Sequence, residues 1–140
     1  MEHEFFLAAF EGCKISKAEW THEAHVRMAW LYLKAYGDWT SALPIVRNGI
    51  KRLNQSHGNM NGYHETITIV YLQLVAERLE DSETVLSWPE FMRKYPELLD
   101  YNSPAFLRYY SRELIFSQQA RQQFVAPDLT PLPFHAQSPA

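Results

Sequence analysis

Hydrophobic residues recur along this chain with the spacing of amphipathic helices. Apolar side chains follow one another at intervals of three and four residues, and segments rich in glycine, serine, asparagine or proline separate the resulting blocks. The pattern predicts six helices, over residues 2–11, 22–36, 40–55, 63–80, 88–95 and 104–124. We therefore expect an all-α protein, a single-domain helical bundle of five to six helices joined by short loops.

Several of the predicted helix ends carry local signals. Thr21 is a favourable N-cap for the second helix, and Gly37 can adopt the left-handed conformation that often ends a helix. Residues 87–90, with the sequence SWPE, have the pattern of a capping box with proline at the first helical position. Pro44 is expected in the first turn of the third helix, where the missing N–H is tolerated.

The segment 67–75, ITIVYLQLV, is apolar on nearly every side, which is typical of a central, buried helix. Its β-branched residues would also suit a strand, but no second strand-like run is present to pair with it. Helix is therefore the better interpretation. We expect the helical domain to cover residues 1–126, followed by a proline-rich tail, 127–140, that is partly docked on the domain.

Composition supports a globular protein and narrows the class of partner. The chain has 140 residues, 46% of them hydrophobic, and a formal net charge of −3. Because the chain has no run of lysine or arginine, we expect it to lack the basic surface that would attract nucleic acids or anionic membranes. It has no apolar stretch of the roughly 18 residues that cross a membrane, and its acidic start is unlike a secretory signal. We therefore expect a cytoplasmic protein.

Three histidines fall on the inner sides of predicted helices. His22 and His25 share the side of their helix that carries Leu33, and His64 shares its side with Tyr71. Short connections make consecutive helices antiparallel, so the second and fourth helices begin at the same end of a bundle. The sequence therefore predicts that these three imidazoles converge. Other polar residues expected near that end are Cys13, Glu19, Asn54 and His57.

Three neutral imidazoles around an open position form the usual catalytic zinc site, and similar ligand sets bind iron, nickel or manganese. A bound divalent metal ion would lower the pKa of a coordinated water, and Glu65 or Glu23 is the nearest candidate base. Tyr63 is a second candidate catalytic residue. The leading hypothesis is thus a small metal-dependent enzyme, a hydrolase, transferase or oxygenase, acting on a small-molecule substrate at His22, His25 and His64.

Two other interpretations stay open. A single inward-facing histidine is more often a core residue hydrogen-bonded to a backbone carbonyl than a metal ligand. The protein would then be a non-enzymatic ligand-binding or protein-interaction module, in which the histidines and Tyr63 line a polar cavity or hold loops together. The third interpretation is a structural protein that forms a homodimer and so buries exposed aromatic residues such as Trp39 and Trp88.

Four motifs spread over nearly the whole chain carry a resemblance. They are Trp20-Thr21-His22-x-x-His25, Arg47-x-Gly49-Ile50-x-x-Leu53-Asn54, Gly62-Tyr63-His64-Glu65-Thr66, and Phe116-Ser117 with a later Pro127-Asp128-Leu129. With them the chain resembles a group of short helical bacterial proteins without an assigned reaction, which implies a shared helical fold. Its three histidines are also similar in arrangement to the DinB/YfiT-like metal-binding bundles. Those proteins bind divalent metals, but place a single histidine before a pair four apart, whereas here a pair three apart comes first.

Overall fold

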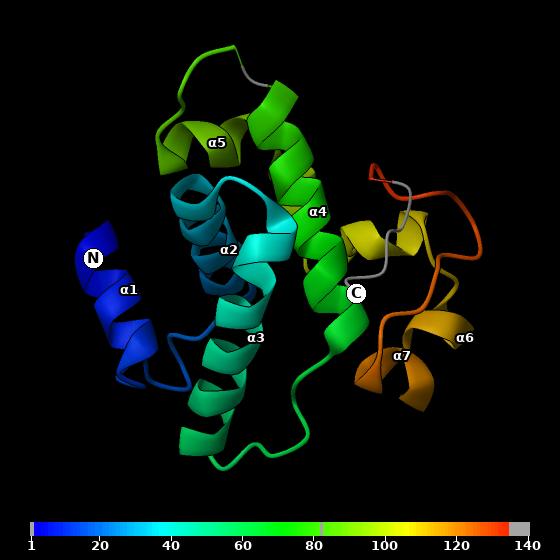
Figure 1. Ribbon diagram of the computed structural model, residues 1–140, viewed down its shortest axis with the longest axis horizontal. Helices are drawn as coiled ribbons and strands as arrows, with labels where there is room; N and C mark the ends of the chain where they lie inside the picture. Colours follow the sequence, from blue (N-terminus) through cyan, green and yellow to red (C-terminus); the bar gives the residue numbers. More distant parts are fainter. Residues whose placement is uncertain (1, 82, 135–140) are drawn as a thin grey trace. The chain divides into compact units, whose positions relative to one another are not determined.

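A computed structural model of the protein describes residues 2–81 and 83–134, and every regular element in these ranges is a helix (Figure 1). The elements are α1 His3–Glu11, α2 His22–Tyr36, α3 Trp39–Ser56, α4 Glu65–Asp81, α5 Trp88–Lys94, the 3-10 helices η1 Pro96–Leu99 and η2 Ala105–Arg108, α6 Arg112–Ile115 and α7 Gln118–Gln122. The predicted all-α fold class is confirmed. The expectation that Trp39 and Trp88 are exposed is wrong, because both side chains are buried. None of these helices is both long enough and apolar enough to cross a membrane.

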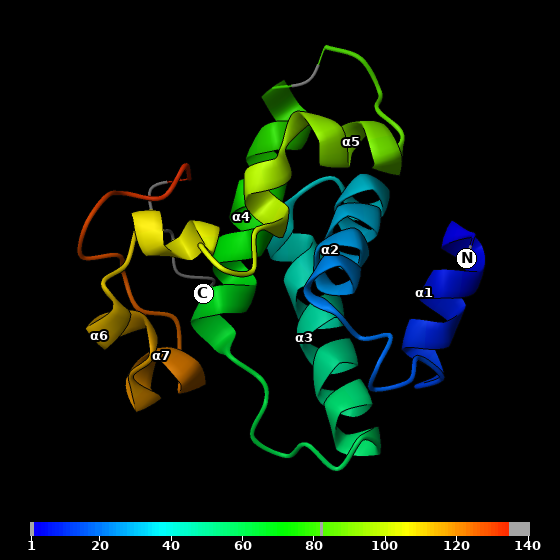
Figure 2. The same ribbon diagram turned by 180° about the vertical axis from the view of Figure 1, so that it is seen from behind.

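The chain divides into two compact units, Met1–Tyr63 and His64–Ala140. In the first unit, α2 packs along α3, and α1 packs against α3 (Figure 2). The N-caps of the two long helices are formed by side chains, since Thr21 Oγ1 accepts a hydrogen bond from the backbone N–H of Ala24 and Asp38 accepts one from Ser41. Gly37 has a φ of 87°, as predicted for the residue that ends α2.

The approach of α1 to α3 depends on a glycine. A Cβ added at Gly49 would lie 2.5 Å from Cζ of Phe10 and still closer to Cε2. Phe10 is completely buried, so its ring occupies the space that any side chain at residue 49 would need. Gly49 therefore lets α1 place this ring directly against the backbone of α3.

The third helix begins earlier than predicted. Because Asp38 is its N-cap, α3 starts at Trp39 and Pro44 lies in the second turn rather than the first. The ring of Pro44 leaves the carbonyl of Thr40 without its usual helical donor. Both residues are exposed, so water can solvate that carbonyl.

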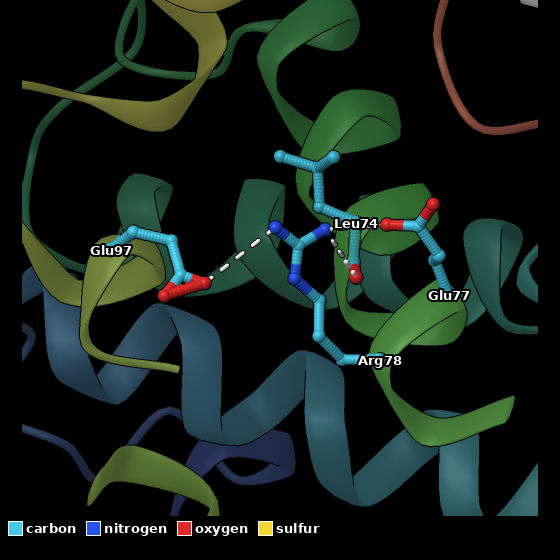
Figure 3. A network of polar contacts seen from close by, with 4 residues as sticks. All are labelled: Leu74, Glu77, Arg78 and Glu97. Atoms are coloured by element: carbon cyan, nitrogen blue, oxygen red, sulfur yellow. Dashed lines mark hydrogen bonds and ion pairs between the residues drawn. The ribbon is translucent and has the colours of Figure 1, made fainter. Parts of the chain in front are cut away.

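In the second unit, α7, η1 and η2 pack against the central helix α4, and α5 packs against η1. The predicted capping box at the start of α5 is confirmed by two reciprocal hydrogen bonds between Ser87 and Glu90, of 2.9 and 3.3 Å. Arg78 links α4 to η1 (Figure 3). Its guanidinium donates to Glu77 at 2.7 Å and to the carbonyl of Leu74, and it lies 3.6 Å from a carboxylate oxygen of Glu97.

The prediction of one continuous helix over 104–124 is wrong. This segment forms three short helices, η2, α6 and α7. Ser111 and Ser117 have extended backbones, with ψ near 155°, and each side chain accepts a hydrogen bond from the N–H three residues later. Each serine therefore caps the start of the helix that follows it, an alternative that competes with a continuous helix.

The tail is docked on the second unit up to residue 134. Backbone N–H groups of Leu129 and Thr130 donate to the carbonyl of Tyr109, and the carboxylate of Asp128 accepts from both the backbone and the hydroxyl of Ser111. Leu132 is buried. The rest of the predicted tail, residues 135–140, lies outside the described residues.

Candidate functional site

The predicted histidine site draws on both units. His22 and His25 belong to the first unit and His64 belongs to the second. Their convergence on one ion therefore stays a prediction. Among residues 2–81 and 83–134, no group of three or more histidine, cysteine, aspartate or glutamate side chains is placed to hold a metal ion.

His25 is held in one orientation by its own helix end. Its Nδ1–H donates to the carbonyl of Thr21 at 2.8 Å, and its ring stacks on Trp20 with centroids 3.8 Å apart. The pKa of His25 is lowered to about 4. Burial is the main cause, the hydrogen bond to Thr21 opposes it, and the charge of His22 contributes to the lowering. His25 is therefore neutral near pH 7. Because the carbonyl can only accept, the proton lies on Nδ1 and the lone pair lies on Nε2.

His64 lies just before α4 rather than within it, so its placement on the inner face of the fourth helix is corrected. Its Nε2–H donates to the carbonyl of Ile115 at 2.6 Å, and its Nδ1 accepts from the backbone N–H of Ile67 at 3.1 Å. The second bond makes His64 the side-chain cap of α4, since it satisfies a backbone donor that the first turn leaves unpaired. Burial is the main cause that lowers the pKa of His64, and the charge of Arg121 adds to it.

Thr66 completes this anchor and was missed by sequence reasoning. Its hydroxyl donates to the carbonyl of Gln123 at 2.9 Å and accepts from the N–H of Val125 at 3.2 Å. Together, His64 and Thr66 attach two distant segments of the second unit to the first turn of α4. The available signal was a threonine two residues after the histidine in the GYHET motif, but nothing in the local pattern identifies its partners.

The two predicted catalytic residues lie in different units. Glu65 is the first residue of α4, a position where a negative charge interacts favourably with the helix dipole. Tyr63 is the last residue of the first unit, and the ammonium group of Lys51 lies over its ring at 5.0 Å. Their catalytic roles stay predictions, as does that of Glu23, which is exposed in the first turn of α2.

Two of the remaining candidates, His57 and Glu19, form structural hydrogen bonds, and a third, Cys13, has an unusual backbone conformation. Nε2 of His57 donates to the carbonyl of Ile15 at 2.8 Å, which ties the end of α3 to the loop after α1. Glu19 forms reciprocal hydrogen bonds with Ser16, and these bonds lower the pKa of its carboxyl group. Cys13 has a φ of 57°, in the left-handed region that costs a non-glycine residue conformational energy.

One arrangement recurs among these histidines. His25, His57 and His64 each place a ring nitrogen 2.6 to 2.8 Å from a backbone carbonyl oxygen.

No protein-family model matches the chain, and no curated protein or solved structure is significantly similar to it. The side-chain chemistry is therefore the basis for assigning a function.

Proposed function

We propose that this protein is a non-enzymatic ligand-binding or protein-interaction module whose histidines hold its loops in place. One observation carries the proposal: both ring nitrogens of His64 bind backbone groups of its own unit. A histidine that ligates a metal must direct a lone pair at the ion. In His64 the Nδ1 lone pair faces the N–H of Ile67 and Nε2 carries a proton, so ligation would break a helix cap or a buried hydrogen bond.

The exposed apolar side chains support an interaction role. Phe5 is 67% exposed and Met60 is 69% exposed in the first unit, and Tyr101 is 78% exposed in the second. The partner is a small molecule or a protein, including a second copy of this chain. A net charge of −3 without basic runs argues against nucleic acid or a membrane as the partner, and we place the module in the cytoplasm.

A metal-dependent enzyme is the second candidate, because one observation favours it. Histidines that bind metals usually donate their other ring N–H to a carbonyl or carboxylate, and His25 donates Nδ1–H to the carbonyl of Thr21. This bond leaves the lone pair on Nε2, with His22 one turn away on the same helix. A divalent ion such as zinc, iron, nickel or manganese would fit this donor chemistry.

Three substitutions of His64 separate the two candidates. Asparagine can keep the acceptor at the position of Nδ1 but cannot reach Ile115, whereas glutamine can keep a donor near the position of Nε2 but loses the cap. Alanine loses both. If His64 is structural, asparagine and glutamine should each cost about 1 kcal/mol of unfolding free energy and alanine about 2 kcal/mol, and metal content should not depend on the variant.

The measurements are urea unfolding and elemental analysis of the purified protein, before and after incubation with one equivalent of each divalent ion. Equimolar metal in the wild-type protein that is lost in all three variants would overturn the proposal and support the enzyme. The control is Asn48→Ala, which changes an exposed residue on α3 and replaces none of the histidines.

A further inference from the structure

The first turn of α1 is attached to α2 by a contact between a histidine and an arginine. Arg27 donates from Nε and Nη2 to Nδ1 of His3, at 3.2 and 2.8 Å. The rings of His3 and Trp30 also form an edge-type contact, with centroids 5.4 Å apart and planes at 62°. His3 and Arg27 are separated by 24 positions in the sequence, so their contact joins α1 to α2 and does not link neighbours within one helix.

This contact can form only with a neutral imidazole. A guanidinium group has donors and no acceptor and stays charged at all ordinary pH values, so Nδ1 of His3 must present its lone pair. Adding a proton to Nδ1 would place a donor against two donors and a cation against a cation. Both hydrogen bonds would then be lost.

The charges around His3 add to this effect. Lys34 lies over the ring of Trp30 at 4.2 Å, so a second cation of α2 is close to the contact. Burial, Arg27, Lys34 and the α-amino group, in that order, lower the pKa of His3 below its usual value of 6.5. The nearby carboxylates are Glu2 and Glu4 on either side of His3 in the sequence, and Glu23, which acts on Arg27.

The rest of α1 does not depend on this contact. Phe6 and Phe10 are buried, and the guanidinium of Arg27 lies over the ring of Phe6 at 4.4 Å. The N-cap residue Glu2, in contrast, makes no side-chain cap hydrogen bond. The first turn therefore has little local support, and loss of the His3 contact would free that turn while the later turns stay packed.

We propose that His3 and Arg27 form a proton-controlled latch, in which neutral His3 holds the first turn of α1 on α2 and protonated His3 releases it. The direction of the pH effect follows from linkage. Because His3 is harder to protonate when the turn is folded than when it is released, the contact stabilises the turn fully above pH 6.5, and this stabilisation is lost as the pH falls below that value. The regulated element is the first turn of α1, whose exposed Phe5 would become mobile on release.

Two variants fix the latch in each state. In His3→Asn, the side-chain oxygen can accept from Arg27 at any pH and cannot be protonated in the accessible range, so the latch stays closed. In His3→Lys, a permanent cation faces Arg27 and the latch stays open. The observable is the hydrogen exchange of the Phe6 amide, which donates to the carbonyl of Glu2 at 2.8 Å.

Exchange is measured by NMR from about pH 7.5 to about pH 5 and corrected for intrinsic chemistry, and the ring pKa of His3 is measured in parallel. In the wild type, protection of Phe6 should fall about tenfold for each unit by which the pKa of His3 lies below 6.5. His3→Asn should stay protected, and His3→Lys should be unprotected throughout. The same fall in His3→Asn as in the wild type, or constant protection in the wild type, would overturn the proposal.

Discussion

Replacing Gly49 with alanine should destabilise the protein, although alanine is the better helix former. In an open helix position the exchange would gain about 1 kcal/mol. Here the new Cβ would lie 2.5 Å from Cζ of Phe10, well inside van der Waals contact. The Phe10 ring cannot easily move aside, because it is fully buried and has Trp20 at 5.4 Å and Tyr32 at 6.1 Å between ring centroids.

Overpacking of this kind costs about 1–3 kcal/mol. Subtracting the gain in helix propensity leaves a net loss of about 1 kcal/mol for Gly49→Ala. The assay is urea unfolding followed by circular dichroism, with the slope of the transition checked in each variant because the chain has two compact units. Asn48→Ala, on an exposed position of the same helix, should change the stability little and supplies the reference for propensity alone.

A double substitution tests the cause. Phe10→Leu removes the ring atoms that the new Cβ would meet, so the loss caused by Gly49→Ala should be smaller in the Phe10→Leu background by about 1 kcal/mol. The sign of the single change is decisive: if Gly49→Ala raises the free energy of unfolding, the close packing of α1 on α3 is not as described and this reasoning is refuted.

Two further changes test the second unit by the same unfolding assay. Gln73 is completely buried on α4, and neither polar atom of its amide has a hydrogen-bond partner in the described part of the chain. Gln73→Met should therefore stabilise the protein by about 1–3 kcal/mol, and a loss of similar size would show that the amide is satisfied. Ser117→Ala removes the cap that the N–H of Ala120 uses and should cost about 1 kcal/mol, whereas an unchanged midpoint would mean that α7 does not need it.

Local signals predicted the fold well where the interactions that decide it are local. The N-cap at Thr21, the end of α2 at Gly37 and the capping box of residues 87–90 each involve groups within one helical turn. The same reasoning failed over 104–124, because apolar spacing continued through Ser111 and Ser117 while their side chains capped new helices. Whether a serine lies inside a helix or caps a new one depends on the other contacts of that segment, and local sequence does not specify them.

For the candidate site, sequence reasoning selected the histidines but not their partners. It identified His25 and His64 as inward-facing residues at helix starts, and both are neutral and largely shielded from solvent. It gave Thr66 no role of its own, and it placed His64 inside a helix that begins one residue later. Whether an imidazole serves as a ligand or as an anchor depends on which group faces each ring nitrogen, and spacing does not specify that.

Sequence alone determined that this chain is helical, since the periodicity of apolar residues and the chemistry of caps act over a few residues. Tertiary structure decided the roles of the polar side chains. The carbonyl of Ile115 that accepts a hydrogen bond from His64 is 51 residues away, and Arg27 is 24 residues from His3. Local sequence patterns do not reveal such pairs, because the two groups come together only when the chain packs. Once packing has excluded water, each group needs the other as its hydrogen-bond partner.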